Sequence, residues 1–136
     1  MGIDIMRKNR QLKVPITRGL VDEIGQELHF ALMAMRAGDT SSTSWKSLGK
    51  VMLAVSIASD GNDRVCYQDK VMVDSSVDIL AQIADRELDT KLWEPTENEL
   101  QNLAEGALAA ESALPWLDYR VLGNAVMSIN AALRCI

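Results

Sequence analysis

The sequence predicts an all-α protein, a single-domain bundle of four to five helices with a short basic N-terminal arm. Apolar residues make up 48% of the 136 positions and recur at three- and four-residue spacing along most of the chain, the pattern of helices that bury one face. A chain of this length can bury roughly two thirds of its unfolded surface. It therefore needs no disulfide or metal to hold its core.

The arm is predicted over residues 1–15 and the helical domain over residues 16–136. The segment up to Pro15 lacks sustained periodicity, so we expect an extended or mobile arm. Helix formation should begin after it, with Thr17 as the N-cap and an apolar stripe that ends before Gly38. That stripe consists of Leu20, Ile24, Leu28, Leu32 and Met35.

A second helix is expected after the turn at residues 39–44. Its apolar positions run from Trp45 through Leu48, Met52 and Val55, and Asp60-Gly61-Asn62 ends the pattern. A connection of about six residues predicts that this helix folds back antiparallel on the first.

Residues 64–91 are predicted to form the third helix, which a break at Asp74-Ser75-Ser76 could divide in two. The β-branched Val71, Val73 and Val77 lower helix propensity, so a short strand at Val71–Val73 is the alternative.

The fourth helix has the clearest start in the chain. Thr96 followed by Glu99, just before an apolar run, is a capping box. Because Pro115 disfavours helix at Leu114, a fifth helix is expected to begin at Pro115 or Trp116 and to continue through Leu133.

The apolar and small residues also carry a family resemblance. It is carried by the run Ala31–Gly38, then by Trp45, Leu48, Val51, Ala54, Ile57 and Gly61, and later by Pro95-Thr96 and Glu99-Leu100. Over about residues 18–133 the chain resembles small uncharacterised helical proteins of proteobacterial phages and plasmids. The resemblance implies an accessory protein of a mobile element. Such proteins regulate replication or transcription, or inhibit host defence, by binding.

Charge is distributed unevenly along the chain. Residues 1–14 carry four basic residues against one acid, a net charge of +3, whereas residues 60–118 carry fourteen acids against four basic residues, a net charge of −10. Most surface charge serves solubility, but fields of this kind also steer association with partners of opposite charge.

Groups capable of catalysis or metal binding are scarce. His29 borders an apolar stripe, and the sequence does not show which acid or nucleophile the fold would bring close to it. Cys66 is expected to be a small buried residue. The turn at residues 60–63 lacks the later ligands of a calcium loop, and most of the tryptophans are expected in the core. We therefore predict no catalytic residue, no metal site and no cofactor.

Three functions remain open. The first is a non-enzymatic inhibitor or regulator, comparable to an anti-CRISPR protein, whose acidic body binds a basic surface of a host protein or nucleoprotein complex. The predicted partner-binding residues are Glu94, Glu97, Glu99, Glu105 and Glu111. The second is a nucleic-acid accessory protein, possible as a homo-oligomer, whose arm binds phosphates through Arg7, Lys8, Arg10 and Lys13. The third is an enzyme with an unusual carboxylate pair.

The expected location is the cytoplasm. The two cysteines lie 69 positions apart in no metal or redox spacing, and no N-terminal stretch has the pattern of a secretion signal. The longest apolar stretches are too short to span a bilayer, so no membrane segment is predicted.

Overall fold

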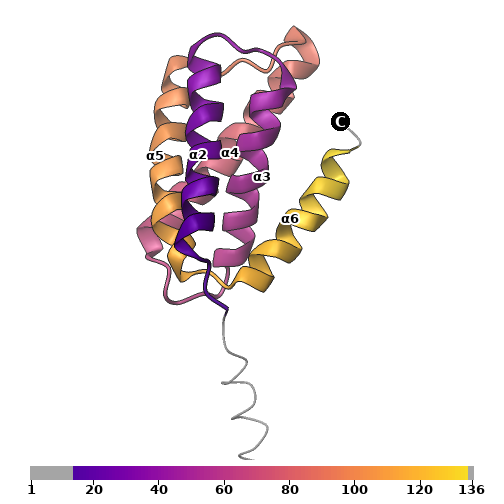
Figure 1. The fold of residues 1–136 in the computed structure, drawn as a ribbon. Coiled ribbons are helices and arrows are strands. Elements are labelled where there is room, and N and C mark those ends of the chain that lie inside the picture. The colour runs from indigo at the N-terminus through magenta and orange to yellow at the C-terminus, as the bar shows by residue number, and fades with distance from the viewer. Residues whose placement is uncertain (1–13, 135–136) are drawn as a thin grey trace, which may run out of the picture.

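A computed structural model describes residues 14–134 of the chain (Figure 1). All the regular structure in this part is helical, which confirms the predicted all-α class. The helices are α2 (Arg18–Arg36), α3 (Ser42–Ser59), α4 (Tyr67–Thr90), α5 (Glu97–Ala113) and α6 (Tyr119–Leu133), with a short 3₁₀ helix, η1 (Leu114–Trp116), between the last two.

Helices α2 to α5 run up and down beside one another, and α6 diverges from the end of the bundle along one side of α3 (Figure 1). Hydrogen bonds join the connections at each end. At one end the Trp93 amide donates to the Thr40 carbonyl at 2.9 Å, and at the other the Tyr119 amide donates to the Val14 carbonyl at 2.7 Å. The short connections thus produce the antiparallel packing that the sequence predicts.

The helix ends confirm most of the predicted boundaries. The Thr17 side chain accepts from the Leu20 amide and caps α2, and Gly38 follows that helix with φ of +101°, a conformation that favours glycine. Thr96 and Glu99 form both hydrogen bonds of the capping box at the start of α5.

Helix α4 is continuous, so the alternative strand at Val71–Val73 is wrong and the break at residues 74–76 does not occur. Val73 is fully buried and Ser76 is almost so, with its hydroxyl donating to the Met72 carbonyl one turn earlier. Packing against α3 and α5 therefore overrides the low propensity of the β-branched residues.

The predicted start of the last helix is also wrong. Pro115 lies in η1, Leu117 is extended, and α6 begins at Tyr119 after the N-cap Asp118, whose side chain accepts from the Arg120 amide. Leu114 and Leu117 are both buried. Burying these two leucines turns the chain before a new helix can start.

Residues 14 and 15, which belong to the predicted arm, lie against the domain. Pro15 forms an isolated antiparallel bridge with Asp118, and the next residue, Ile16, is buried. The remaining arm positions, residues 1–13, lie outside the described part of the chain.

Large aliphatic side chains from α2 to α5 fill the core. Leu28, Leu48, Met52, Ile83 and Leu103 are among the largest fully buried side chains. Each contributes on the order of 1.5–3 kcal/mol by removing its apolar surface from water. Helix α3 supplies buried residues on several sides and contacts each of the other four α-helices.

Helices α4 and α5 approach closely at Gly106. A Cβ atom at this position would overlap the Ser76 side chain and lie 3.4 Å from the Met72 carbonyl oxygen. Glycine is thus required here by the proximity of the two helices.

We predict that Thr96→Ala lowers the free energy of unfolding by about 1 kcal/mol, because it removes the hydroxyl that caps α5. Chemical denaturation followed by circular dichroism measures this change. Thr43→Ala, at an exposed position of α3, is the control and should have little effect. An unchanged midpoint for Thr96→Ala would contradict the cap.

We predict opposite effects for alanine at two helical glycines. Gly106→Ala should destabilise the protein by about 1–3 kcal/mol through overpacking against Ser76. Gly49→Ala should stabilise it by up to about 1 kcal/mol, because its Cβ would meet no atom within 4 Å and alanine favours helix. Equal effects in thermal denaturation would contradict the close α4–α5 approach.

Candidate functional site

The five carboxylates predicted to bind a partner occupy three environments. Glu94 is exposed in the connection before α5, and Glu97 and Glu105 are exposed on α5 itself. Glu99 is only 8% exposed, and Glu111 is partly buried. Of the five, only Glu94, Glu97 and Glu105 are therefore exposed to solvent.

Glu99 forms a two-pronged ion pair with Arg86 of α4. The two guanidinium nitrogens of Arg86 donate to the carboxylate oxygens at 2.6 and 3.0 Å, and one of them also donates to the Glu94 carbonyl. The hydrogen bonds from Arg86 hold the pKa of Glu99 below its ordinary value, although burial opposes the shift. This pair fastens the end of α4 to the start of α5.

Glu111 pairs with His29 across the α2–α5 contact. The His29 Nε2 atom lies 2.7 Å from a Glu111 carboxylate oxygen. The other oxygen occupies the space that a side chain at Gly25 would fill. The structure thus supplies the acid that the sequence could not place beside His29.

The His29–Glu111 pair borders a shallow hollow of about 340 Å³. Its lining residues are Asp22, Gly25, Gln26, His29, Phe30, Met33 and Glu111. None of these side chains is a hydroxyl, thiol or amine nucleophile of the kind that a histidine base activates. The pair is therefore best explained as a contact that holds α2 against α5.

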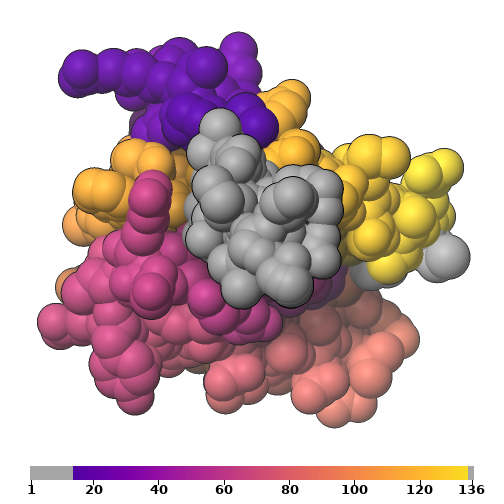
Figure 2. All heavy atoms as spheres, turned by 90° about the horizontal axis from the view of Figure 1, so that it is seen from below, coloured from indigo at the N-terminus to yellow at the C-terminus, as the bar shows by residue number. Residues whose placement is uncertain are grey.

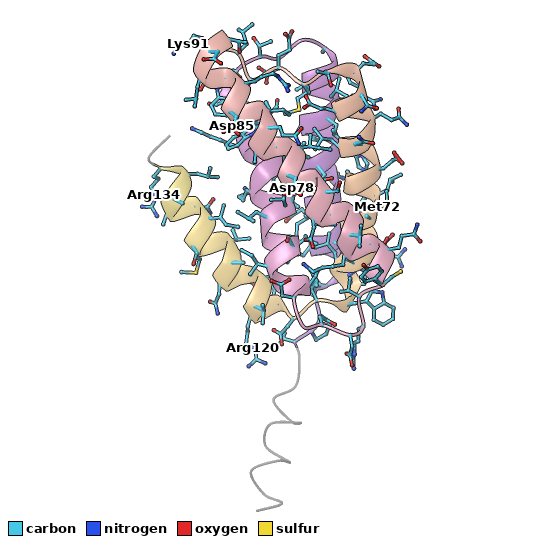
Figure 3. The ribbon with its side chains drawn as sticks, turned by 180° about the vertical axis from the view of Figure 1, so that it is seen from behind. Met72, Asp78, Asp85, Lys91, Arg120 and Arg134 are labelled. Atoms are coloured by element: carbon cyan, nitrogen blue, oxygen red, sulfur yellow. The ribbon has the colours of Figure 1, made fainter. Side chains whose placement is uncertain are left out.

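A different acidic feature lies on α4. Asp74, Asp78, Asp85 and Asp89 are spaced by four, seven and four residues, which places them along one side of a helix. We call these four residues the α4 acidic ridge. Figure 3 looks onto this helix, with Asp78 and Asp85 labelled.

Only the first member of the α4 acidic ridge has a cationic partner in the part of the chain that the structure describes. Lys70 donates to Asp74 at 3.0 Å and to Asp60 at 2.6 Å. No ion pair joins Asp78, Asp85 or Asp89 to another described residue, and all three are exposed. The ridge therefore presents three carboxylates to solvent.

Net charge by segment does not reveal this ridge and points instead to the acidic residues at positions 94–111. The available signal was the helical spacing of the aspartates. This spacing identifies a common side of the helix only if residues 67–90 form one unbroken helix, as they do in the structure.

Other sequence-based expectations change in the structure. Cys66 is exposed at the N-cap of α4 rather than buried. Trp45 and Trp93 pack against the core with ring centroids 4.6 Å apart, but Trp116 is 52% exposed. In the turn that resembles a calcium loop, Asp60 pairs with Lys70, and Asn62 donates to the Trp116 carbonyl.

Comparison of the chain with models of protein families, with curated proteins and with solved structures finds no match. Over residues 14–134, no group of three or more histidine, cysteine or acidic side chains is arranged to hold a metal ion. Within the same range, no helix combines the length and apolarity needed to cross a bilayer.

The Arg86–Glu99 pair predicts a pH-dependent stability. Because the pKa of Glu99 in the folded protein lies below its ordinary value of 4.5, its contribution is complete above that pH and is lost as the pH falls through the folded pKa. Glu99→Gln should therefore lower the free energy of unfolding by about 1–2 kcal/mol at pH 7, since Arg86 is partly exposed.

The difference between Glu99→Gln and wild type should begin to shrink below about pH 4.5, where the unfolded chain takes up the proton, and should vanish as the pH falls through the lower pKa of the folded carboxylate. Denaturant titrations between pH 3 and 7 measure it. Glu105→Gln, an exposed change on the same helix, serves as the matched control and should stay within about 0.5 kcal/mol of wild type. A difference independent of pH would show that the charge of Glu99 plays no part.

Proposed function

We propose that this protein is a non-enzymatic interaction protein that binds a basic surface of a host protein or nucleoprotein complex. The observation that carries the proposal is the α4 acidic ridge, which presents Asp78, Asp85 and Asp89 to solvent without a cationic partner among the described residues. The exposed Glu94, Glu97 and Glu105 add to the same negative field.

The spacing of the aspartates in the α4 acidic ridge lowers the stability of α4. Asp74–Asp78 and Asp85–Asp89 are like-charge pairs four residues apart, each destabilising by about 0.2–0.5 kcal/mol. Asp89 also lies in the last turn of the helix, which contains no basic residue, where the helix dipole disfavours a negative charge. A basic partner would relieve both effects.

The ridge is suited to attracting such a partner over a distance. Asp78 and Asp85 are two helical turns apart, about 10.5 Å along the axis. This separation is close to the screening length of about 8 Å at physiological ionic strength, so their fields overlap. Overlapping fields accelerate encounter with positive surfaces and disfavour nucleic acid, which is negative.

The resemblance to phage- and plasmid-borne helical proteins supports a narrower role. An accessory protein of a mobile element with an acidic body would act as an inhibitor or regulator, comparable to an anti-CRISPR protein. Its target would be a host surface that otherwise binds nucleic acid, because such surfaces are strongly basic.

We predict that Asp78→Lys, Asp85→Lys and Asp89→Lys combined weaken capture of host proteins by at least about tenfold, because they reverse the field of the ridge. The measurement is affinity capture from host lysate at 50 and 300 mM salt, with the captured proteins identified by mass spectrometry. Wild-type capture should fall at the higher salt.

Two further variants complete this test. Glu94→Lys, Glu97→Lys and Glu105→Lys combined should weaken capture less than the ridge reversal, and deletion of residues 1–13 should matter least. If the deletion abolishes binding to nucleic acid and both reversals leave capture unchanged, the arm residues Arg7, Lys8, Arg10 and Lys13 carry the function instead.

A further inference from the structure

An apolar groove lies beside the α4 acidic ridge, where α6 diverges from the bundle. Figure 2, seen from below, shows α6 (yellow) protruding from the side of the molecule, and Figure 1 shows it leaning away from α3 toward the C-terminus. The groove has a volume of about 190 Å³ and almost no polar surface. It is lined by Trp45, Gly49, Leu53, Val77, Leu80, Ala81, Ile129 and Leu133.

Gly49 contributes to the groove from the interior of α3. A Cβ atom here would meet no atom within 4 Å, so the packing of the described residues does not require glycine at this position. Glycine nevertheless weakens a helix interior relative to alanine. Its effect is to leave open space in the groove that a side chain would occupy.

The acidic ridge forms one rim of this groove. Ala81, which lines it, lies three residues after Asp78 and four before Asp85, so the three share one side of α4. An apolar group seated in the groove would therefore have a carboxylate one turn away on each side. Apolar grooves receive the apolar face of amphipathic helices, and carboxylates beside the groove favour a helix with basic residues next to that face.

The geometry points to a docking site for a basic amphipathic helix of the protein partner. The helix would place one large apolar side chain in the groove, and lysines or arginines about two turns apart would face Asp78 and Asp85. This inference rests on the proposed function, since it assigns the place and the chemistry of the contact. A dry apolar cavity of about 150 Å³ admits benzene, so the groove is large enough for one such side chain.

The described helices of this chain are poor candidates for the occupant. None of them carries two cations seven residues apart. The two lysines of α3 are four residues apart, the two cations of α2 and the two of α4 are more widely spaced, α5 has no cation and α6 has one. A second copy would also bring a second acidic ridge, which repels the first. Charge complementarity therefore favours a different, basic chain.

The test uses the full-length protein labelled with ¹⁵N and a synthetic alanine-based helical peptide. The peptide carries two lysines seven residues apart and a leucine three residues after the first lysine. Binding is followed by the chemical shifts of the Gly49 amide and the Trp45 indole, which report on the groove. One control peptide has glutamates in place of the lysines, and another has alanine in place of the leucine.

We expect the lysine–leucine peptide to bind and both control peptides to bind at least about tenfold more weakly. Gly49→Leu, which fills the groove, should weaken binding by a similar factor. Gly49→Ala serves as a folding control that leaves most of the space open. Asp78→Asn with Asp85→Asn should weaken binding and reduce its salt dependence, whereas Glu97→Gln with Glu105→Gln, a matched change on α5, should have a much smaller effect on both.

Four outcomes would overturn the docking site. If the aspartate changes weaken binding but Gly49→Leu does not, or if the peptide fails to bind while lysate capture still depends on the ridge, the proposed function stands without the groove. Self-association in sedimentation that Gly49→Leu abolishes would make the groove a contact between copies. Tighter peptide binding after deletion of residues 1–13 would make the chain's own N-terminal segment its occupant.

Discussion

The structure depends on the need to bury α3 on more than one side. This helix is apolar over much of its circumference, with Leu48, Met52 and Val55 fully buried and Val51 and Ala54 nearly so. Such a helix cannot be covered by a single neighbour. Helices α2, α4 and α5 enclose one part of its surface, and α6 covers another. Because α6 diverges along α3, the cover is incomplete near Gly49 and Leu53, and the apolar groove results.

The α4–α5 pair determines which charges face outward. The close approach at Gly106 and the Arg86–Glu99 ion pair hold the two helices at two separate points. Together they turn Glu99 into the interior and leave the opposite side of α4, with Asp78 and Asp85, exposed to solvent. Glu99, at this contact, thus stabilises the fold, whereas Asp78 and Asp85 on the outer side of α4 form no ion pair with another described residue. The net charge of a segment does not distinguish acidic residues that pair within the fold from those that remain exposed.

Much of the fold could be predicted because its signals are local. Thr17, Gly38 and the Thr96–Glu99 capping box act within one helical turn, so a short stretch of sequence contains all the groups involved. The start of α6 could not be placed this way, because burial of Leu114 and Leu117 decides it. The exposure of Cys66 and Trp116 could not be predicted for the same reason, because it depends on how distant helices meet.

The sequence by itself determined the all-α class, most helix boundaries and the acidic character of the body. Periodicity, capping and net charge depend only on residue types and their spacing. Only the tertiary structure decided which acids are available. It paired Glu111 with His29, 82 positions away, and Glu99 with Arg86 on the preceding helix. It also joined residues of α3, α4 and α6 into one groove. Such contacts arise from packing between helices, whose geometry is set by the whole core rather than by any one segment.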